Sequence, residues 1–421
     1  MTLNHLPRAI VPWALLSALL IACDDDDSAQ NIDASQPDAV VMEMPDQGIS
    51  PDMMADAPDM GSEAPDAGAD DPAPLSLMPE GFHPSAIIGF SPLIAANRDA
   101  VEAAWGELLS AGMQVGRAQL SWADLEPSPG VFDEAALDET LAPLRAEGLS
   151  IFLTLETIDS SSFEIPADLI EDELTLAEDR AFDDPVILQR FEALLTWLVP
   201  KLVERGVFAV AVGNEPDNTI VDRPELGAEV AGFTEAAHRI FRDLEPRMSM
   251  SMTLTLGAVT GDYAPPIVAH NDFLSINYYC QTVDNRVKTP AEVDADLDAM
   301  EALADGRPII FQELGCSAAY ADPEARRLAG SDAEQQAFLA QVLARFEAAP
   351  ETYRAAYWFT LLDFGPNEAD LIADLLCAEG FLDLCEILRE AMETYGLLRW
   401  SDGSKRPGFV TLMESIERAS R

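Results

Sequence analysis

Basic side chains are scarce in this sequence of 421 residues, which holds 25 Lys and Arg residues against 75 Asp and Glu residues. No Lys or Arg lies between Arg8 and Arg98. The formal net charge is −50 at pH 7, and a field of this sign repels phosphate groups. We therefore exclude nucleic acid as a partner, whereas the argument places no restriction on a neutral substrate.

Residues that hold metals and cofactors are also few. The chain has 4 His and 5 Cys, without a Cys-x-x-Cys pair or a histidine cluster of zinc-ligand spacing. A Gly-x-Gly-x-x-Gly turn, which binds dinucleotide phosphates, is absent after the first expected strand. We therefore expect neither a metal site nor a cofactor.

One long apolar run begins the chain, at residues 10–21, after the positive charge of Arg8. It is too short to span a bilayer as a permanent helix, so we expect residues 1–22 to be a signal peptide. Leu20-Ile21-Ala22-Cys23 resembles the bacterial lipobox. This resemblance implies a lipid on Cys23 that anchors the protein to a bacterial membrane in the cell envelope, facing the periplasm or the exterior. An ordinary signal peptide with a coincidental cysteine is the alternative.

Residues 23–76 have a different composition, dominated by Asp, Pro, Ala, Met and Ser with repeated Pro-Asp pairs. Such a segment cannot bury enough apolar surface to offset the entropy lost on ordering. We therefore predict a disordered acidic linker that separates the membrane anchor from a folded domain. A small calcium-binding module is the alternative, but the glycine turn and terminal glutamate of a calcium loop are missing.

Residues 77–421 alternate short apolar runs with longer amphipathic segments, and the alternation repeats eight times. Eight such units predict an α/β fold of the (β/α)8 TIM-barrel type, with a doubly wound open sheet as the competitor. The expected strands are 85–90, 114–120, 150–156, 207–213, 248–257, 273–279, 308–314 and 354–361. The expected helices are 98–112, 134–147, 185–204, 226–244, 292–304, 331–347 and 407–418.

Polar and aromatic residues follow these apolar runs, at the strand ends where barrel enzymes carry their chemistry. Glycoside hydrolysis needs one carboxyl group to protonate the leaving oxygen and a second on the other face of the sugar. The fourth and seventh strands face one another across an eight-stranded barrel, so Glu215 and Glu313 are candidates for this pair. The strand-end residues are Trp122, Asn214, Glu215, Asn277, Tyr278, Glu313 and Trp358.

Four motifs in the correct order resemble those of the clan A glycoside hydrolases. Val212-Gly213-Asn214-Glu215-Pro216 is similar to the clan's Asn-Glu-Pro motif, and Ile310-Phe311-Gln312-Glu313-Leu314-Gly315 is similar to its nucleophile motif. Residues 116–132 resemble the signature of the second strand, and residues 396–407 resemble the final motif. The resemblance covers nearly all of residues 85–410.

This resemblance implies a retaining β-glycosidase that acts by double displacement on a β-linked poly- or oligosaccharide. Glu215 would be the general acid/base and Glu313 the nucleophile. The substrate-binding roles that it implies are a contact from Asn214 to the sugar's 2-hydroxyl, ionisation of Glu313 by Arg117, a hydrogen bond from Tyr278 to Glu313 and an apolar platform from Trp358, with Trp122 beside them at the barrel mouth.

Two other functions use the same barrel: a non-catalytic carbohydrate-binding lipoprotein and a transglycosylase. The third strand ends in Glu156, without the His or Trp that many clan members have near this point, which leaves the identity of the sugar open. We expect Glu126 to anchor the loop after the second strand, and we expect a monomer.

Four cysteines remain for an exported domain if Cys23 carries a lipid, and they allow three connectivities. Cys280 and Cys316 follow adjacent strands, and Cys377 and Cys385 are near in sequence. We predict the pairs 280–316 and 377–385, with free buried thiols as the alternative.

Overall fold

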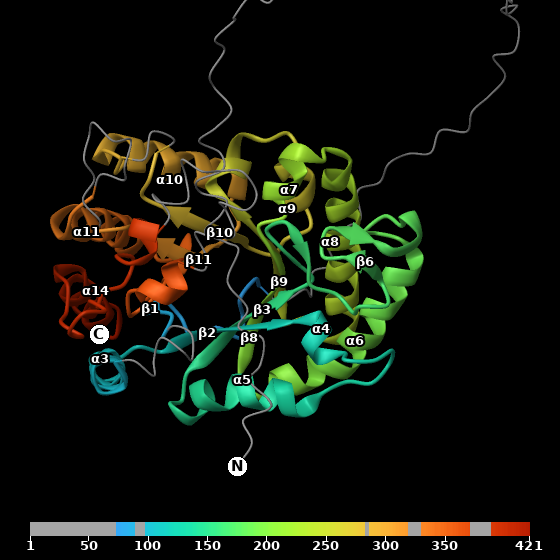
Figure 1. The fold of residues 1–421 in the computed structure, drawn as a ribbon, viewed down its shortest axis with the longest axis horizontal. Helices are drawn as coiled ribbons and strands as arrows, with labels where there is room; N and C mark the ends of the chain where they lie inside the picture. Colours follow the sequence, from blue (N-terminus) through green and yellow to red (C-terminus); the bar gives the residue numbers. More distant parts are fainter. Residues whose placement is uncertain (1–72, 89–96, 283–285, 319–329, 371–388) are drawn as a thin grey trace, which may run out of the picture. The chain divides into compact units, whose positions relative to one another are not determined.

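The structure is a computed structural model, and it describes residues 73–88, 97–282, 286–318, 330–370 and 389–421 (Figure 1). The expected signal peptide, the lipid site at Cys23 and the linker up to residue 72 lie outside these ranges, as do Cys377 and Cys385. Residues 73–76, which we expected in the linker, are described together with the barrel. Leu75 is buried, and its backbone N–H donates to Ser249 Oγ at 2.8 Å.

Eight parallel strands form the barrel, in the order β1-β12-β11-β10-β9-β8-β3-β2. Strands β1 and β2 lie next to one another and bring the ends of the sheet together. The predicted (β/α)8 fold is confirmed. The strands are β1 (His83–Ala86), β2 (Val115–Ser121), β3 (Ser150–Glu156), β8 (Val207–Asn214), β9 (Ser249–Thr255), β10 (Leu274–Tyr279), β11 (Ile309–Gly315) and β12 (Tyr353–Trp358).

In the ranges that the structure describes, seven long helices surround the strands, and each begins and ends within two residues of its predicted bounds (Figure 1). Helix α6 shows why they pack there: Phe191, Leu194, Leu195 and Leu198 recur at helical spacing and are completely buried. Helix α14 packs on both α3 and α11. The helices are α3 (Arg98–Ala111), α5 (Glu134–Ala146), α6 (Pro185–Glu204), α8 (Glu225–Leu244), α10 (Pro290–Ala304), α11 (Asp332–Ala348) and α14 (Pro407–Ala419).

The amino-terminal half of the barrel interior is filled by aromatic rings. The Phe152 ring lies 6.2 Å from that of Phe208, 5.9 Å from that of Phe273 and 6.0 Å from that of Tyr357. Leu75 and other apolar side chains extend this cluster. Burying one such ring contributes about 1.5–3 kcal/mol, so this half of the interior is a stabilising core.

Short elements between β3 and α6, and after several other strands, were not expected. β4 (Ile158–Asp159) and β5 (Ser162–Phe163) form a hairpin, and Asp159 pairs with Asn214 of β8. This pairing joins the start of the long acidic insertion to the barrel. The others are β6 (Ile170–Asp172), β7 (Thr175–Leu176), η2 (Ala177–Asp179), α4 (Trp122–Leu125), α7 (Asp217–Asp222), η3 (Leu256–Thr260) and α9 (Ala264–Val268).

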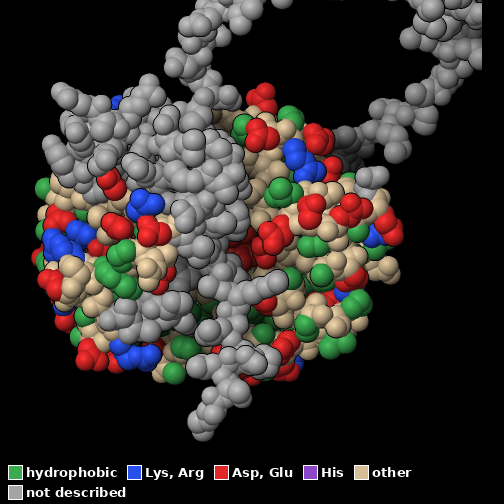
Figure 2. Space-filling model, in the orientation of Figure 1, with side chains coloured by type: hydrophobic (Ala, Val, Ile, Leu, Met, Phe, Trp, Pro, Cys, Tyr) green, Lys and Arg blue, Asp and Glu red, His purple; other side chains and the backbone are tan. Residues whose placement is uncertain are grey.

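The molecular surface is rich in acidic side chains, which Figure 2 shows spread over the face toward the viewer. Over the ranges that the structure describes, none of the helices has the length and apolar content needed to cross a membrane. Within the same ranges, three or more His, Cys, Asp or Glu side chains nowhere converge in a way that could hold a metal ion.

Candidate active site

An extra residue interrupts each of the two strands that carry the candidate glutamates. Between Ala211 and Asn214, β8 advances three residues while its neighbour β9 advances two. Strand β11 has the same irregularity between Phe311 and Leu314, where it pairs with β12. A β-bulge of this kind redirects the side chains that follow it and is frequent beside active sites. Both Gln312 and Glu313 can therefore present polar groups to the barrel interior.

Glu313 is buried and held by two donors. Arg117 Nη2 lies 3.3 Å from Glu313 Oε1, in the ion pair expected from the sequence. The hydroxyl of Tyr279 donates to Glu313 Oε2 at 2.6 Å. Gly315 makes room for this ring, because a Cβ at that position would lie 2.5 Å from the nearest Tyr279 ring carbon. One carboxylate oxygen therefore faces a cation and the other a hydroxyl.

Burial raises the pKa of the Glu313 carboxyl, whereas the charge of Arg117 and the hydrogen bond from Tyr279 act to lower it. The pKa of Tyr279 is raised well above its ordinary value by burial and by the charges of Glu313 and Glu215. Tyr279 therefore keeps its proton and remains a hydrogen-bond donor to the carboxylate.

Glu215 follows β8 and is buried with a left-handed backbone conformation, at a φ of 50°. This conformation is rare for a side chain with a Cβ and is often found at functional sites. Asn277 Nδ2 donates to Glu215 Oε1 at 2.6 Å. Asn218 Nδ2 and Ser160 Oγ lie 3.0 Å and 3.3 Å from Oε2. The surrounding amides and hydroxyl hold the carboxyl group in one orientation.

Asn214 and Gln312 connect the two halves of the site. Gln312 Nε2 donates to Asn214 Oδ1 at 2.7 Å, and Asn277 Nδ2 donates to the same oxygen at 3.1 Å. Gln312 Oε1 accepts from Thr154 at 3.0 Å and from Thr253 at 2.7 Å. Buried polar networks of this kind, in which each amide has partners, fix the positions of the groups around them.

Two further acids lie beside this network at the end of β3. Gln119 Nε2 donates to Glu156 Oε1, and Asn214 Nδ2 donates to Asp159 Oδ1 at 2.8 Å. Burial raises the pKa of both carboxyl groups, and the charge of Asp159 raises that of Glu156 further. The interaction between the two side chains further raises the pKa of Glu156 and lowers that of Asp159.

The expected contact between Tyr278 and Glu313 is wrong, because the next residue, Tyr279, makes it. The Tyr278 hydroxyl instead donates to Asp296 of α10 at 2.9 Å, and Lys288 Nζ lies 4.6 Å from the centre of the Tyr278 ring. Side chains alternate along a strand. Since Asn277 faces the interior and bonds to Glu215, Tyr278 faces the helices.

Both tryptophans lie outside the site. Trp122 is fully buried against Phe191 of α6, with ring centres 5.2 Å apart. Trp358 is in register with Leu314, which is in register with Tyr278, and registered neighbours in a sheet share a face. The Trp358 indole N–H donates to the carbonyl of Tyr395 at 3.0 Å. Neither ring is placed to be a sugar platform.

Glu126 anchors the loop after β2. Its carboxylate accepts from the backbone N–H of Gly130 at 2.6 Å and from the Trp122 indole at 2.8 Å, and it forms an ion pair with Arg190. These contacts agree with the structural role expected for this residue.

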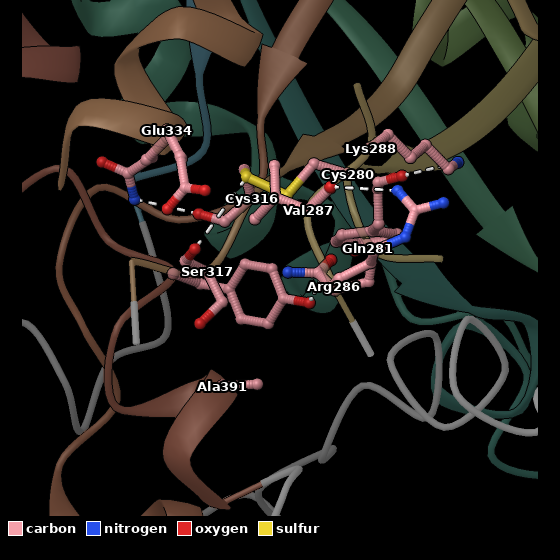
Figure 3. Close-up of a disulfide and its surroundings, with 12 residues drawn as sticks. Cys280, Gln281, Arg286, Val287, Lys288, Cys316, Ser317, Glu334 and Ala391 are labelled. Atoms are coloured by element: carbon pink, nitrogen blue, oxygen red, sulfur yellow. Dashed lines mark hydrogen bonds between the residues drawn. A yellow bond between two sulfur atoms is a disulfide. The ribbon is translucent and has the colours of Figure 1, made fainter. Parts of the chain in front are cut away.

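A disulfide joins Cys280 and Cys316, which is the first of the two expected pairs (Figure 3). Cys280 directly follows Tyr279, and Cys316 directly follows Gly315. The backbone of Lys288 donates to the Cys280 carbonyl at 2.8 Å, and Gln335 donates to the Cys316 carbonyl at 2.9 Å. The bond therefore braces β10 and β11 beside the Tyr279–Glu313 contact.

Four elements supply further residues around the glutamates, whose contacts sequence reasoning did not predict. Asn277 had been noted only as a polar residue at a strand end, Asp159 only as an acid near the barrel mouth and Gln312 only within the nucleophile motif. They are Tyr279 and Asn277 of β10, Asp159 and Ser160 of the β4–β5 hairpin, Asn218 of α7 and Gln312 of β11.

No protein-family model matches the chain, and no curated protein matches it in sequence. Solved structures do match. An exo-β-1,4-mannosidase, Op5Man5 from Opitutaceae bacterium strain TAV5, is 17% identical with a TM-score of 0.57. The alignment covers 80% of this chain and 59% of that protein, so the chain spans less than two thirds of its length.

Two further solved structures have a similar likeness. A GH5_18 variant from Streptomyces cattleya, in complex with Manβ1-4GlcNAc, is 18% identical with a TM-score of 0.58, and the alignment covers 81% of each chain. The apo structure of a β-glucosidase, 1317, is 17% identical with a TM-score of 0.51, covering 78% of this chain and 89% of that one. At these identities the likeness establishes the barrel fold.

Proposed function

We propose that this protein is a retaining glycoside hydrolase that cleaves a β-linked glycan, with Glu313 as nucleophile and Glu215 as general acid/base. The observation that carries the proposal is the placement of two buried glutamates after bulges on β8 and β11, at the carboxyl end of the barrel. The motifs around both residues support it, as do the glycosidase names of the solved structures that match the chain.

In the first step, a carboxylate oxygen of Glu313 attacks the anomeric carbon and the glycosidic C–O bond breaks. Glu215 gives its proton to the leaving oxygen, so the first product leaves as a neutral alcohol. In the second step Glu215 takes a proton from water, whose oxygen displaces Glu313 from the anomeric carbon. Two inversions retain the β configuration.

The contacts of each glutamate suit these roles. Arg117 and Tyr279 stabilise the charge of Glu313 before attack and hold its two oxygens in place. Asn277 and Asn218 orient Glu215 through different oxygens. Asn214 has the position from which clan A enzymes contact the 2-hydroxyl, and we propose the same contact here.

Glu313→Gln should reduce turnover by roughly four or more orders of magnitude, because an amide cannot form the glycosyl ester. Glu215→Ala should slow both steps. Azide should restore turnover of aryl glycosides, because it attacks the anomeric carbon in place of water and needs no base to remove a proton. The assay uses aryl β-mannosides and β-glucosides first, since the solved neighbours are named for these activities. Glu347→Gln, on the outer helix α11, is the matched control and should keep wild-type rates.

The same assay separates the other two functions. A protein that binds β-glycans without releasing any product, across mannan, glucan, galactan and xylan, would be the non-catalytic alternative. A protein whose main product is a longer glycan formed on an added acceptor sugar would be a transglycosylase. Near-wild-type turnover by Glu313→Gln would contradict the assignment of the nucleophile.

We further propose that a lipid on Cys23 holds the enzyme in a bacterial cell envelope, as a monomer, at the end of the acidic linker. This part of the proposal rests on the sequence of residues 1–76.

A further inference from the structure

Among the residues that the structure describes, Glu156 has a buried carboxyl oxygen that receives no hydrogen bond. Its side chain is completely inaccessible to solvent at the carboxyl end of β3. Oε1 accepts from Gln119, but no N–H or O–H group in the described ranges donates to Oε2. An unsatisfied oxygen in such a place is costly and calls for a ligand or a functional reason.

On one side, Glu156 is linked to the proposed nucleophile. Gln119 donates to Glu156 and accepts from Arg117 Nη2 at 3.0 Å. The same Arg117 nitrogen lies 3.3 Å from Glu313. Two residues therefore separate Glu156 from the carboxylate that would bond to the sugar.

On the other side, Glu156 is linked to the proposed acid/base. Its neighbour Asp159 accepts from Asn214 at 2.8 Å, and Ser160 Oγ lies 3.4 Å from Asp159. Ser160 Oγ also lies 3.3 Å from Glu215 Oε2. Glu156 thus lies on the inner face of the barrel between the two catalytic positions.

A second unsatisfied acceptor occurs in the same region. Asn277 donates through Nδ2 to Glu215 and Asn214, whereas its Oδ1 has no donor among the residues that the structure describes. Both atoms can accept a hydrogen bond and neither receives one. Sugar hydroxyl groups are donors of the required kind.

We propose that Oε2 of Glu156 accepts a hydrogen bond from a hydroxyl group of the sugar ring that becomes bonded to Glu313. Glu156 is then a residue that determines which sugar is accepted. The inference rests on the proposed function and names a feature of its substrate.

The test compares Glu156→Gln with the wild type on the best aryl β-glycoside and on its monodeoxy analogues. The amide keeps a carbonyl for Gln119 but puts an NH2 group, which cannot accept, in place of Oε2. We expect kcat/KM on the parent glycoside to fall by about 10- to 100-fold. On the one analogue that lacks the contacted hydroxyl, variant and wild type should be nearly equal, while the loss persists on the others.

Glu164→Gln is the matched control, because Glu164 is another largely buried acid near Asp159 and should give the wild-type pattern on every analogue. If Glu156→Gln does not fold, as judged by thermal unfolding, Glu156→Asp provides the same comparison with a shorter side chain. Equal loss on all analogues, or no loss on the parent, would overturn the proposal. If the wild type prefers an aryl glucosaminide and Glu156→Gln loses that preference, Glu156 contacts an ammonium group of the substrate, and the proposed contact with a hydroxyl group is wrong. Failure of the wild type to cleave any glycoside is a distinct result that removes the proposed function itself.

Discussion

The two halves of the barrel interior carry opposite chemistry along the same strands. Phe152, Thr154 and Glu156 are successive inward residues of β3: an aromatic ring, then a hydroxyl, then a carboxyl. Phe152 packs on three other rings, whereas Thr154 bonds to Arg117 and to Gln312. Four residues along one strand thus separate the part of the interior that stabilises the fold from the part that holds the proposed catalytic groups.

The polar half contains buried atoms that lack partners, and within the described ranges the Tyr357 hydroxyl of the aromatic half is another such atom. Glu156 Oε2 and Asn277 Oδ1 have no donor in the described ranges, and Glu215 has a left-handed backbone. Features of this kind reduce stability and persist where function requires them. Mutations in the two halves should therefore separate stability from activity.

Phe152→Ala should have the largest effect on stability, because it opens a cavity among three aromatic rings. We expect the free energy of unfolding to fall by about 3–5 kcal/mol. Urea unfolding measures this change, and the surviving folded enzyme should keep most of its kcat/KM. Glu313→Gln is the counterpart in the other half. It leaves the buried Arg117 without its anionic partner, which also costs stability, but unlike Phe152→Ala it should abolish turnover. If Phe152→Ala lowered the free energy of unfolding by less than about 1 kcal/mol, the aromatic half of the interior would not be the part that stabilises the fold.

The two adjacent tyrosines of β10 test the division across one strand. Tyr279→Phe removes the hydrogen bond to Glu313 and should lower kcat/KM by about 10- to 100-fold, with little change in thermal unfolding. Tyr278→Phe removes the bond to Asp296 on the helix side and should leave kcat/KM close to the wild-type value. Steady-state kinetics of both variants decide the matter. Equal losses would show that the strand is sensitive to either change and that the hydroxyl of Tyr279 has no special role.

The fold could be predicted because its signals are long and repeated. Eight apolar runs and seven amphipathic segments lie within a few residues of the observed strands and helices. The (β/α)8 pattern needs no knowledge of individual contacts. The two glutamates could be singled out as well, because a polar residue at the end of a buried parallel strand stands out.

The aromatic residues were misplaced because alternation was not applied. Arg117 and Gln119 face inward, so odd-numbered residues of β2 share that face, and Trp122 comes after the strand as the first residue of α4. The same count places Tyr279 inside and Tyr278 outside. Here the signal was present in the sequence.

Other parts of the site could not have been predicted. The bulges in β8 and β11 add one residue each, and sequence periodicity does not reveal where a register shifts. The β4 and β5 strands have two residues each, too few for a periodic pattern. Asp159 and Ser160 reach the site only because that hairpin pairs with Asn214. Long-range pairing decides these contacts, and local sequence carries little information about it.

The smallest effect that we predict concerns pH, and it again separates the two halves. Burial raises the pKa of Asp217, which follows Glu215-Pro216 at the catalytic end, to about 6. The aromatic residues of the other half carry no carboxyl group. At low pH Asp217 is protonated in both the folded and the unfolded chain. As the pH rises from about 4 to about 6, the unfolded chain loses this proton first, so the folded state becomes less stable. Above about pH 6 both states have lost the proton, and the stability falls no further through Asp217.

Asp217→Asn should remove this contribution, since the amide does not titrate. Between about pH 4.5 and about pH 7.5, the wild type should lose about 1–3 kcal/mol more unfolding free energy than the variant, which corresponds to a few degrees in Tm. Measuring Tm for both proteins across this range cancels the contributions of the other acids, because they are common to the two chains. Phe152→Ala provides the control from the other half: its Tm should be lower at every pH, by an amount that does not change with pH. Parallel plots of Tm against pH for Asp217→Asn and the wild type would show that the pKa of Asp217 is the same in the folded and unfolded chains. Water would then reach this carboxyl group in the folded protein.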